Sequence, residues 1–132
     1  MRETILLIHF TDVDRKNKLT RALFPLKIKI REVEKSEYHK PIGYLAGNRE
    51  LPCRTEEYQG EELSGEMMVM AGLSSAQMDR VLNAVRRSGA GPIPYKAVLT
   101  PVNQFWDVPR LFEELRQEHM AMHREGQRKE EI

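Results

Sequence analysis

The chain has 132 residues, and its 21 lysines and arginines nearly balance its 20 aspartates and glutamates. This balance argues against the broad electropositive surface of a dedicated nucleic-acid-binding protein. The length suits one domain that buries its own core without disulfides or metals. Cys53 has no internal disulfide partner, the start does not resemble a secretory signal, and no apolar run approaches the ~18 residues that cross a bilayer. We therefore expect a cytoplasmic protein that binds neither nucleic acid nor membrane.

The first third of the chain predicts a strand, a helix and a second strand. The compact apolar run 4–10 indicates a central strand buried on both faces, and it contains His9, interpreted as a core or near-core histidine. Thr11 and Asp12 offer N-cap oxygens for an amphipathic helix that ends near Pro25. Strict alternation over residues 27–33 is typical of a half-exposed strand near a sheet edge. The exposed helix face is basic and is interpreted as a solvated surface: Arg15, Lys16, Lys18 and Arg21.

Residues 34–65 show no periodicity and are interpreted as a long insertion. Long loops in compact domains are often binding loops or lids. Within the insertion, residues 41–47 (PIGYLAG) carry enough apolar mass to dock as a short helical turn, whereas residues 49–65 are expected to be mobile.

The next segment repeats the pattern of the first. Residues 67–71 predict a strand, Ser74 and Gln77 form a capping box for an amphipathic helix, and Gly89 is suited to end that helix. Residues 95–100 then predict a fourth strand. A third helix is expected to begin after Asp107, a suitable N-cap.

The doubled β-α-β order predicts an α+β fold. The expected architecture is a ferredoxin-like plait: a four-stranded antiparallel sheet, two helices on one face, an insertion over residues 34–65 and an extra C-terminal helix. A small doubly wound α/β sheet is the alternative, although the insertion offers no crossover helix between the second and third strands. We expect one domain over residues 1–125 and a flexible tail over residues 126–132.

Four stretches of the sequence resemble an uncharacterised bacterial family, domain of unknown function 3783. They are TILLIHFTD, PIGYLAG, GEEL followed after two residues by EMMVMAG, and KAVLTPVNQFW. The resemblance extends from about Glu3 to about Met122. It implies a stand-alone bacterial protein, and it carries no activity, cofactor or catalytic residue onto this sequence.

No complete catalytic or metal-binding pattern is present, so we expect no cofactor. His119 and His123 are four residues apart on a helix and are weak metal candidates, because a metal needs more ligands than two. Cys53 lies beside Arg54 in the insertion and His39 is in the same segment, but spacing alone does not place them together.

The preferred candidate for a ligand site is a cleft between the sheet and the third helix. The run that leads from the fourth strand to that helix is rich in polar and aromatic side chains, and the insertion adds a tyrosine. The candidate residues are Tyr44, Lys96, Thr100, Asn103 and Trp106. For Trp106 itself, the favoured interpretation is a staple of the last helix onto the core, with the binding pocket as the alternative.

These observations favour a non-enzymatic domain that binds a small molecule or a protein partner and that self-associates through a strand edge or the last helix. The alternative is a small metal- or thiol-dependent enzyme that uses His119 and His123, or Cys53 with His39. A third hypothesis is an assembly factor held to its partner by the Met-rich final helix, which carries Met120 and Met122.

Overall fold

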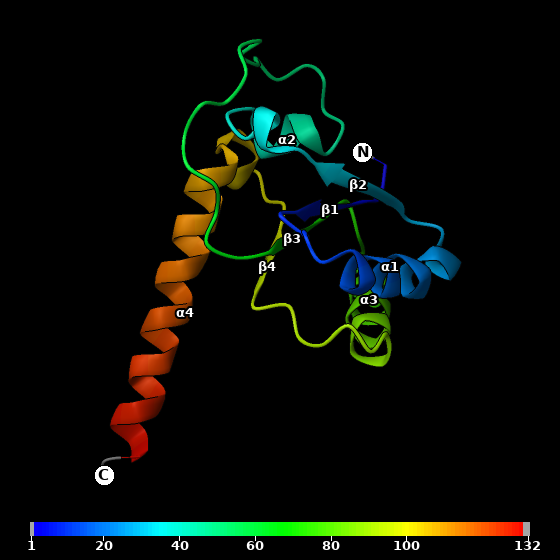
Figure 1. The fold of residues 1–132 in the computed structure, drawn as a ribbon, viewed down its shortest axis with the longest axis vertical. Helices are drawn as coiled ribbons and strands as arrows, with labels where there is room; N and C mark the ends of the chain where they lie inside the picture. Colours follow the sequence, from blue (N-terminus) through cyan, green and yellow to red (C-terminus); the bar gives the residue numbers. More distant parts are fainter. Residues whose placement is uncertain (1, 131–132) are drawn as a thin grey trace.

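The computed structural model describes residues 2–130, with side chains described as far as Met122. Four strands and four helices alternate along these described residues (Figure 1). The strands are β1 (Thr4–Ile8), β2 (Lys29–Val33), β3 (Met67–Ala71) and β4 (Tyr95–Val98). The helices are α1 (Val13–Leu23), α2 (Ile42–Leu45), α3 (Ser75–Arg87) and α4 (Val108–Glu130), with short 3-10 turns η1 (Phe24–Leu26), η2 (Lys35–Glu37) and η3 (Asn103–Phe105). The predicted α+β class is confirmed.

The sheet contains two β-α-β units placed side by side, in the order β2-β1-β3-β4. Within each unit the strands are adjacent and parallel, β1 with β2 and β3 with β4. The units meet at the antiparallel pair β1 and β3, where Leu6 lies opposite Val69 at the centre of both strands. The carboxyl ends of β1 and β2 therefore lie at one end of the sheet, and those of β3 and β4 lie at the opposite end.

The prediction of a purely antiparallel sheet was wrong, because two of the three strand pairs are parallel. In a ferredoxin-like plait, each β-α-β unit admits a strand of the other unit between its own two strands. Here the edge strands have exchanged places, so β2 lies beside β1 and β4 beside β3. The expected duplication is present, but the units are adjacent and not interleaved.

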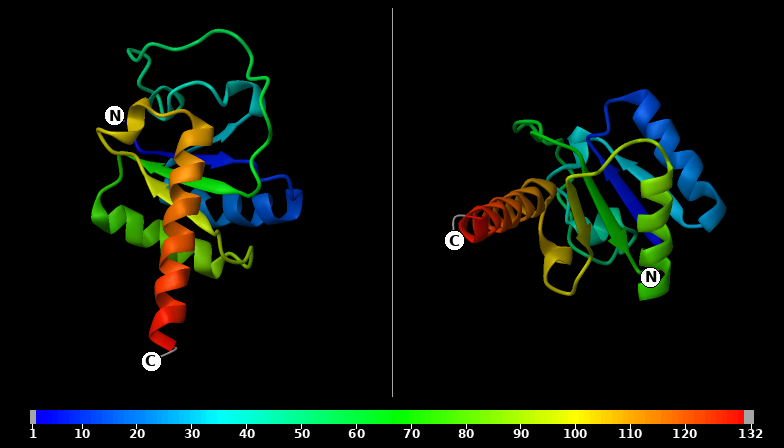
Figure 2. Two further views of the ribbon diagram at one scale, coloured as in Figure 1. Left: turned by 90° about the vertical axis from the view of Figure 1, so that its left-hand side faces the viewer. Right: turned by 90° about the horizontal axis from the view of Figure 1, so that it is seen from below.

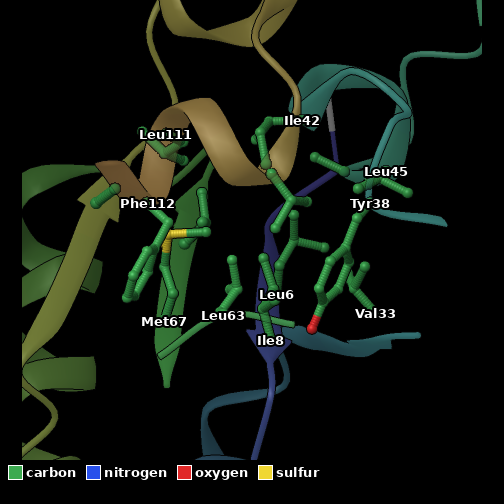
Figure 3. Close-up of a cluster of buried hydrophobic side chains, with 14 of the residues drawn as sticks. Leu6, Ile8, Val33, Tyr38, Ile42, Leu45, Leu63, Met67, Leu111 and Phe112 are labelled. Carbon is green, nitrogen blue, oxygen red and sulfur yellow. The ribbon is translucent and has the colours of Figure 1, made fainter. Parts of the chain in front are cut away.

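Both faces of the sheet are buried, each against different elements. Leu6, Ile8, Met67 and Val69 point into a cluster with residues of α2, the insertion and α4, shown in Figure 3. The alternate side chains of the same strands join a second cluster with α1 and α3: Ile5, Leu7, Met68 and Met70. Figure 2 shows α1 and α3 on one side of the sheet and α4 on the other. Because β1 and β3 contact both layers, all ten of their residues are buried.

The helices begin where the sequence predicts. The Asp12 carboxylate accepts a hydrogen bond from the Arg15 amide (3.2 Å), and Ser74 and Gln77 form the predicted capping box. The Asp107 carboxylate accepts from the Arg110 amide at the start of α4 (3.0 Å). These caps satisfy amides that have no partner inside the helix, and they use side chains close in sequence.

Arg15 joins the two units and is not part of a solvated face. Its Nε lies 2.8 Å from Glu66 Oε1, just before β3. Its guanidinium also donates to the backbone carbonyls of Ala90 and Pro92, in the loop between α3 and β4. The solvated interpretation of the basic face is therefore wrong for Arg15.

The insertion lies over the sheet face that α4 also covers. Residues 42–45 form the helical turn α2, as predicted, and the Ile42 amide donates to the Trp106 carbonyl (2.8 Å). Further along, the Tyr58 amide donates to the Ser36 carbonyl (2.9 Å), and Leu63 is buried in the first cluster. The segment expected to be mobile is therefore held to the body at Tyr58 and Leu63.

We predict that Gly43→Ala lowers the free energy of unfolding by about 1–3 kcal/mol through overpacking. A Cβ at Gly43 would lie 2.7 Å from Leu51 Cδ1 and 3.1 Å from the Gln104 carbonyl oxygen, which is backbone and moves only with η3. Urea denaturation measures the loss. Gly47→Ala is not a matched control because Gly47 has φ +122°, so Ala121→Gly in the exposed part of α4 serves instead, with an expected cost near 1 kcal/mol from helix propensity alone.

The C-terminal helix α4 is longer than the sheet that it covers. Val108, Leu111 and Phe112 are buried, but from Gln117 to Met122 every residue is exposed. Figure 1 shows the second half of α4 extending beyond the sheet. No helix among the described residues is both long and apolar enough to cross a membrane.

Candidate functional site

His9 adopts a backbone conformation that few residues accept. It follows β1 directly and has φ +65°, in the left-handed region. Gly72 follows β3 directly and has φ +74°, so each unit has a left-handed residue immediately after its first strand, although the turn to the helix spans residues 9–12 in the first unit and residues 72–74 in the second. Glycine adopts this conformation without steric cost, whereas a residue with a Cβ pays about 1–2 kcal/mol. The first unit therefore keeps an imidazole at a position where the second unit has glycine.

His9 lines a crevice at the end of the sheet where the carboxyl ends of the parallel strands β1 and β2 lie. The volume of this crevice is about 200 Å³. We call it the His9 crevice, and its lining residues are Leu7, His9, Phe10, Thr11, Lys16, Glu32, Val33, Lys35, Tyr38 and Glu62. The carboxyl ends of parallel strands are the usual ligand-binding edge of α/β units, because the loops that follow the strands converge there. The prediction that β1 continues to Phe10 was wrong, and its end at Ile8 leaves the His9 side chain 23% exposed in the crevice.

A tyrosine, a glutamate and the histidine meet inside the crevice. The Tyr38 hydroxyl donates to Glu62 Oε1 at 2.6 Å, and the Leu63 amide donates to the same oxygen at 2.8 Å. His9 Nδ1 lies 3.5 Å from that oxygen. Tyr38 is 1% exposed and packs beside Val33 (Figure 3). Burial, followed by the hydrogen bond to Glu62, raises the pKa of Tyr38 well above its ordinary value, so the hydroxyl remains a donor.

We expect Tyr38→Phe to lower the free energy of unfolding by about 1–2 kcal/mol at neutral pH, since it removes a buried hydrogen bond to a carboxylate. The pKa of Tyr38 is raised in the folded protein. Its contribution to stability is therefore complete below the unfolded pKa of about 10 and is lost as pH rises towards the folded pKa. Urea denaturation from neutral pH to above pH ~10 should show the difference between wild type and variant shrinking. A difference that stays constant or grows with pH would contradict this assignment.

The mouth of the crevice carries charges of both signs. Lys16 Nζ lies 3.3 Å from Glu32 Oε1, while no carboxylate lies within 4.0 Å of the Lys35 amine among the described side chains. The first turn of α1 begins beside these groups, after Asp12. The crevice can therefore hold an anionic group near Lys16 and Lys35 and a hydrogen-bond donor near Glu62.

The residues predicted to form a cleft lie in two different parts of the fold. Thr100, Asn103 and Trp106 lie together in the loop around η3, on which α2 with Tyr44 packs. Lys96 points to the opposite face of the sheet, because its partner Met68 belongs to the cluster under α1 and α3.

The side chains around η3 are largely engaged within the chain. Asn103 is 8% exposed, accepts from the Thr100 amide (2.8 Å) and donates to the Val98 carbonyl (3.0 Å). The guanidinium of Arg110 lies 4.5 Å from the centre of the Trp106 ring, and that of Arg49 lies 4.4 Å from the Tyr44 ring. The hydrogen bonds of Asn103 hold the loop around η3 in place, so Asn103 is a structural residue. The Tyr44–Arg49 and Trp106–Arg110 pairs form a second candidate surface for a ligand.

The structure does not join the other candidates into a site. The His119 ring lies edge-on to Tyr95 at 5.7 Å, and the His123 side chain is outside the described side chains. Both ring nitrogens of His39 are buried without a hydrogen-bond partner, and Cys53 Sγ contacts the Arg54 carbonyl. Among the described side chains, no three potential metal ligands lie together. The metal- or thiol-dependent alternative stays a prediction.

Residues 66–122 match the family model described as Domain of unknown function (DUF3783). The match confirms the family predicted from the sequence, over a stretch that contains β3, α3, β4 and the described side chains of α4. The resemblance noted for the first unit lies outside this match. No curated protein and no solved structure matches the chain.

Proposed function

We propose that this protein is a ligand-binding domain whose site is the His9 crevice. The observation that carries the proposal is the left-handed conformation of His9 at the position where the second unit has Gly72. A strained backbone conformation persists only where the surrounding structure enforces it, and such residues cluster at ligand and active sites. The polar groups that converge on the crevice from the turn after β1, from α1, from β2 and from the insertion support the same proposal.

The ligand is a small polar molecule that carries both an anionic group and a hydrogen-bond donor. Lys16 and Lys35 suit the anionic group, while Glu62 Oε2, which makes no hydrogen bond within the described part of the chain, suits the donor. The volume of about 200 Å³ limits the ligand to roughly the size of an amino acid or a small hydroxy acid.

A binding screen tests this proposal. Amino acids, hydroxy acids and small phosphate esters are tested for a rise in melting temperature, and each hit is then measured by calorimetric titration against wild type, Glu62→Gln and Lys35→Gln. We expect each substitution to weaken binding by about tenfold, the equivalent of one charge-assisted hydrogen bond. Arg54→Gln, on an exposed residue that does not line the crevice, is the matched control and should leave the affinity unchanged. A flat response to the whole screen would refute the proposal.

A second candidate function is self-association through α4. The apolar stripe of this helix is buried at Val108 and Leu111 and partly buried at Leu115, and Met122, about two turns further along, is 73% exposed. An isolated helical segment gains little stability in water without a packed face. We expect the projecting half of α4 to pack against the same segment of a second copy, so that light scattering finds a dimer for the full chain and a folded monomer after truncation at Glu118. An unchanged mass would count against it.

A further inference from the structure

A groove lies between α3 and the edge strand β4, on the sheet face opposite α4. Two helices cover this face, and the residues of α3 that reach the core, Val81 and Val85, pack with Met68 and Met70 of β3. The outer strand β4 is left partly uncovered, and its Val98 side chain is 43% exposed. The resulting space, which we call the α3–β4 groove, has a volume of about 450 Å³, within the range of small-molecule sites.

The floor of the α3–β4 groove is apolar. Leu82 and Val85 are contributed by one face of α3, and Pro92 and Ile93 by the loop that enters β4. Ile93 is 1% exposed and Val85 is 6% exposed, so the floor is continuous with the core cluster under α1 and α3. An apolar body placed here removes further hydrocarbon surface from water.

The rim of the groove is cationic. Arg86 follows Val85 on α3, and Lys96 projects from β4 with its amine 2.8 Å from the Ile93 carbonyl. Among the described side chains, no carboxylate lies within 4.0 Å of either cation: the partner of Arg86 is the neutral amide of Asn83. Two cations without counter-charges beside an apolar floor are complementary to an amphiphilic anion.

We propose that the α3–β4 groove binds an unbranched aliphatic carboxylate, with the chain on Leu82, Val85 and Ile93 and the carboxylate between Arg86 and Lys96. The lining residues all lie between 82 and 96, within the stretch that matches the family. The His9 crevice has no residue in this stretch. The two sites therefore share no residue. If the His9 crevice binds no ligand, binding of a carboxylate in the α3–β4 groove can still be tested, and the reverse also holds.

Calorimetric titration with hexanoate, octanoate and decanoate, each below its micelle concentration, tests the proposal. We expect saturable binding that tightens with chain length by up to about fourfold per added methylene group. The double variant Arg86→Gln/Lys96→Gln should weaken decanoate binding by at least about fivefold, a modest effect because both cations are exposed. Decanol, which lacks the charge, should bind wild type and this variant equally.

Arg80→Gln is the matched control, because Arg80 is an exposed arginine of α3 that does not line the groove. It should leave decanoate binding unchanged. The proposal is overturned if wild type does not bind decanoate saturably, if the double variant binds it as well as wild type, or if Arg80→Gln weakens binding as much as the double variant. If decanoate bound at the exposed Met122 of α4 instead, the double variant would bind it as well as wild type does.

Discussion

Replacing His9 with glycine should raise the free energy of unfolding by about 0.5–1 kcal/mol while weakening ligand binding in the His9 crevice by at least about tenfold. The stabilisation arises because glycine removes the Cβ penalty of a left-handed residue, about 1–2 kcal/mol, at an entropic cost of about 0.5–1 kcal/mol. His9 itself contributes little to stability, since its contact with Glu62 is long (3.5 Å) and partly exposed. Urea denaturation and calorimetric titration measure the two effects.

The second unit provides a matched control. Gly72→His places the same side chain at the equivalent position and should lower the free energy of unfolding by about 1–2 kcal/mol, because Gly72 also has a positive φ, +74°. His9→Asn, in contrast, should preserve stability, since asparagine tolerates the left-handed region, and should still weaken binding. If His9→Gly instead lost more than about 1 kcal/mol, His9 would be a structural residue and the functional interpretation would fail.

Leu6→Ala should cause the largest loss of stability, about 3–4 kcal/mol. Leu6 is fully buried at the centre of β1, beside Arg31 of β2 and Val69 of β3, where the two units meet. Its side chain belongs to the cluster that also contains residues of the insertion and of α4 (Figure 3), so its neighbours fill a cavity there only if an element of the fold moves.

The corresponding control is Val102→Ala, because Val102 is 65% exposed and should change stability by less than about 0.5 kcal/mol. Urea denaturation measures both variants. A loss below about 1 kcal/mol for Leu6→Ala would contradict the packing of α2 and α4 on this face of the sheet.

The sequence is sufficient to predict the elements of the fold, because their signals are local. The capping box of Ser74 and Gln77 and the alternation along β2 depend on residues within one or two turns of each other. The apolar character of β1 and β3 also identifies the central strands. The order of the edge strands could not be predicted in the same way. β2 and β4 are half-exposed whether the units are interleaved or adjacent, so their patterns do not distinguish the two arrangements.

The site was harder to predict than the fold. His9 adjoins a strongly apolar run, so it was assigned to the strand, and its positive φ has no signature in a single sequence. Comparison of the two units offers one signal: Gly72 directly follows β3, as His9 directly follows β1. Glu62 and Tyr38 are 24 residues apart in an insertion without periodicity, and only the folded chain brings them together.

Two-dimensional amide NMR of the protein, titrated with the tightest ligand from the screen, tests the central claim most directly. If the His9 crevice is the site, the largest shift changes will fall on the amides of residues 9–12 and 35–38, and His9→Gly will remove them. Changes confined to Tyr44 and residues 100–106 would place the site on the second candidate surface, with the Tyr44–Arg49 and Trp106–Arg110 pairs, and would contradict the assignment of the site to the His9 crevice.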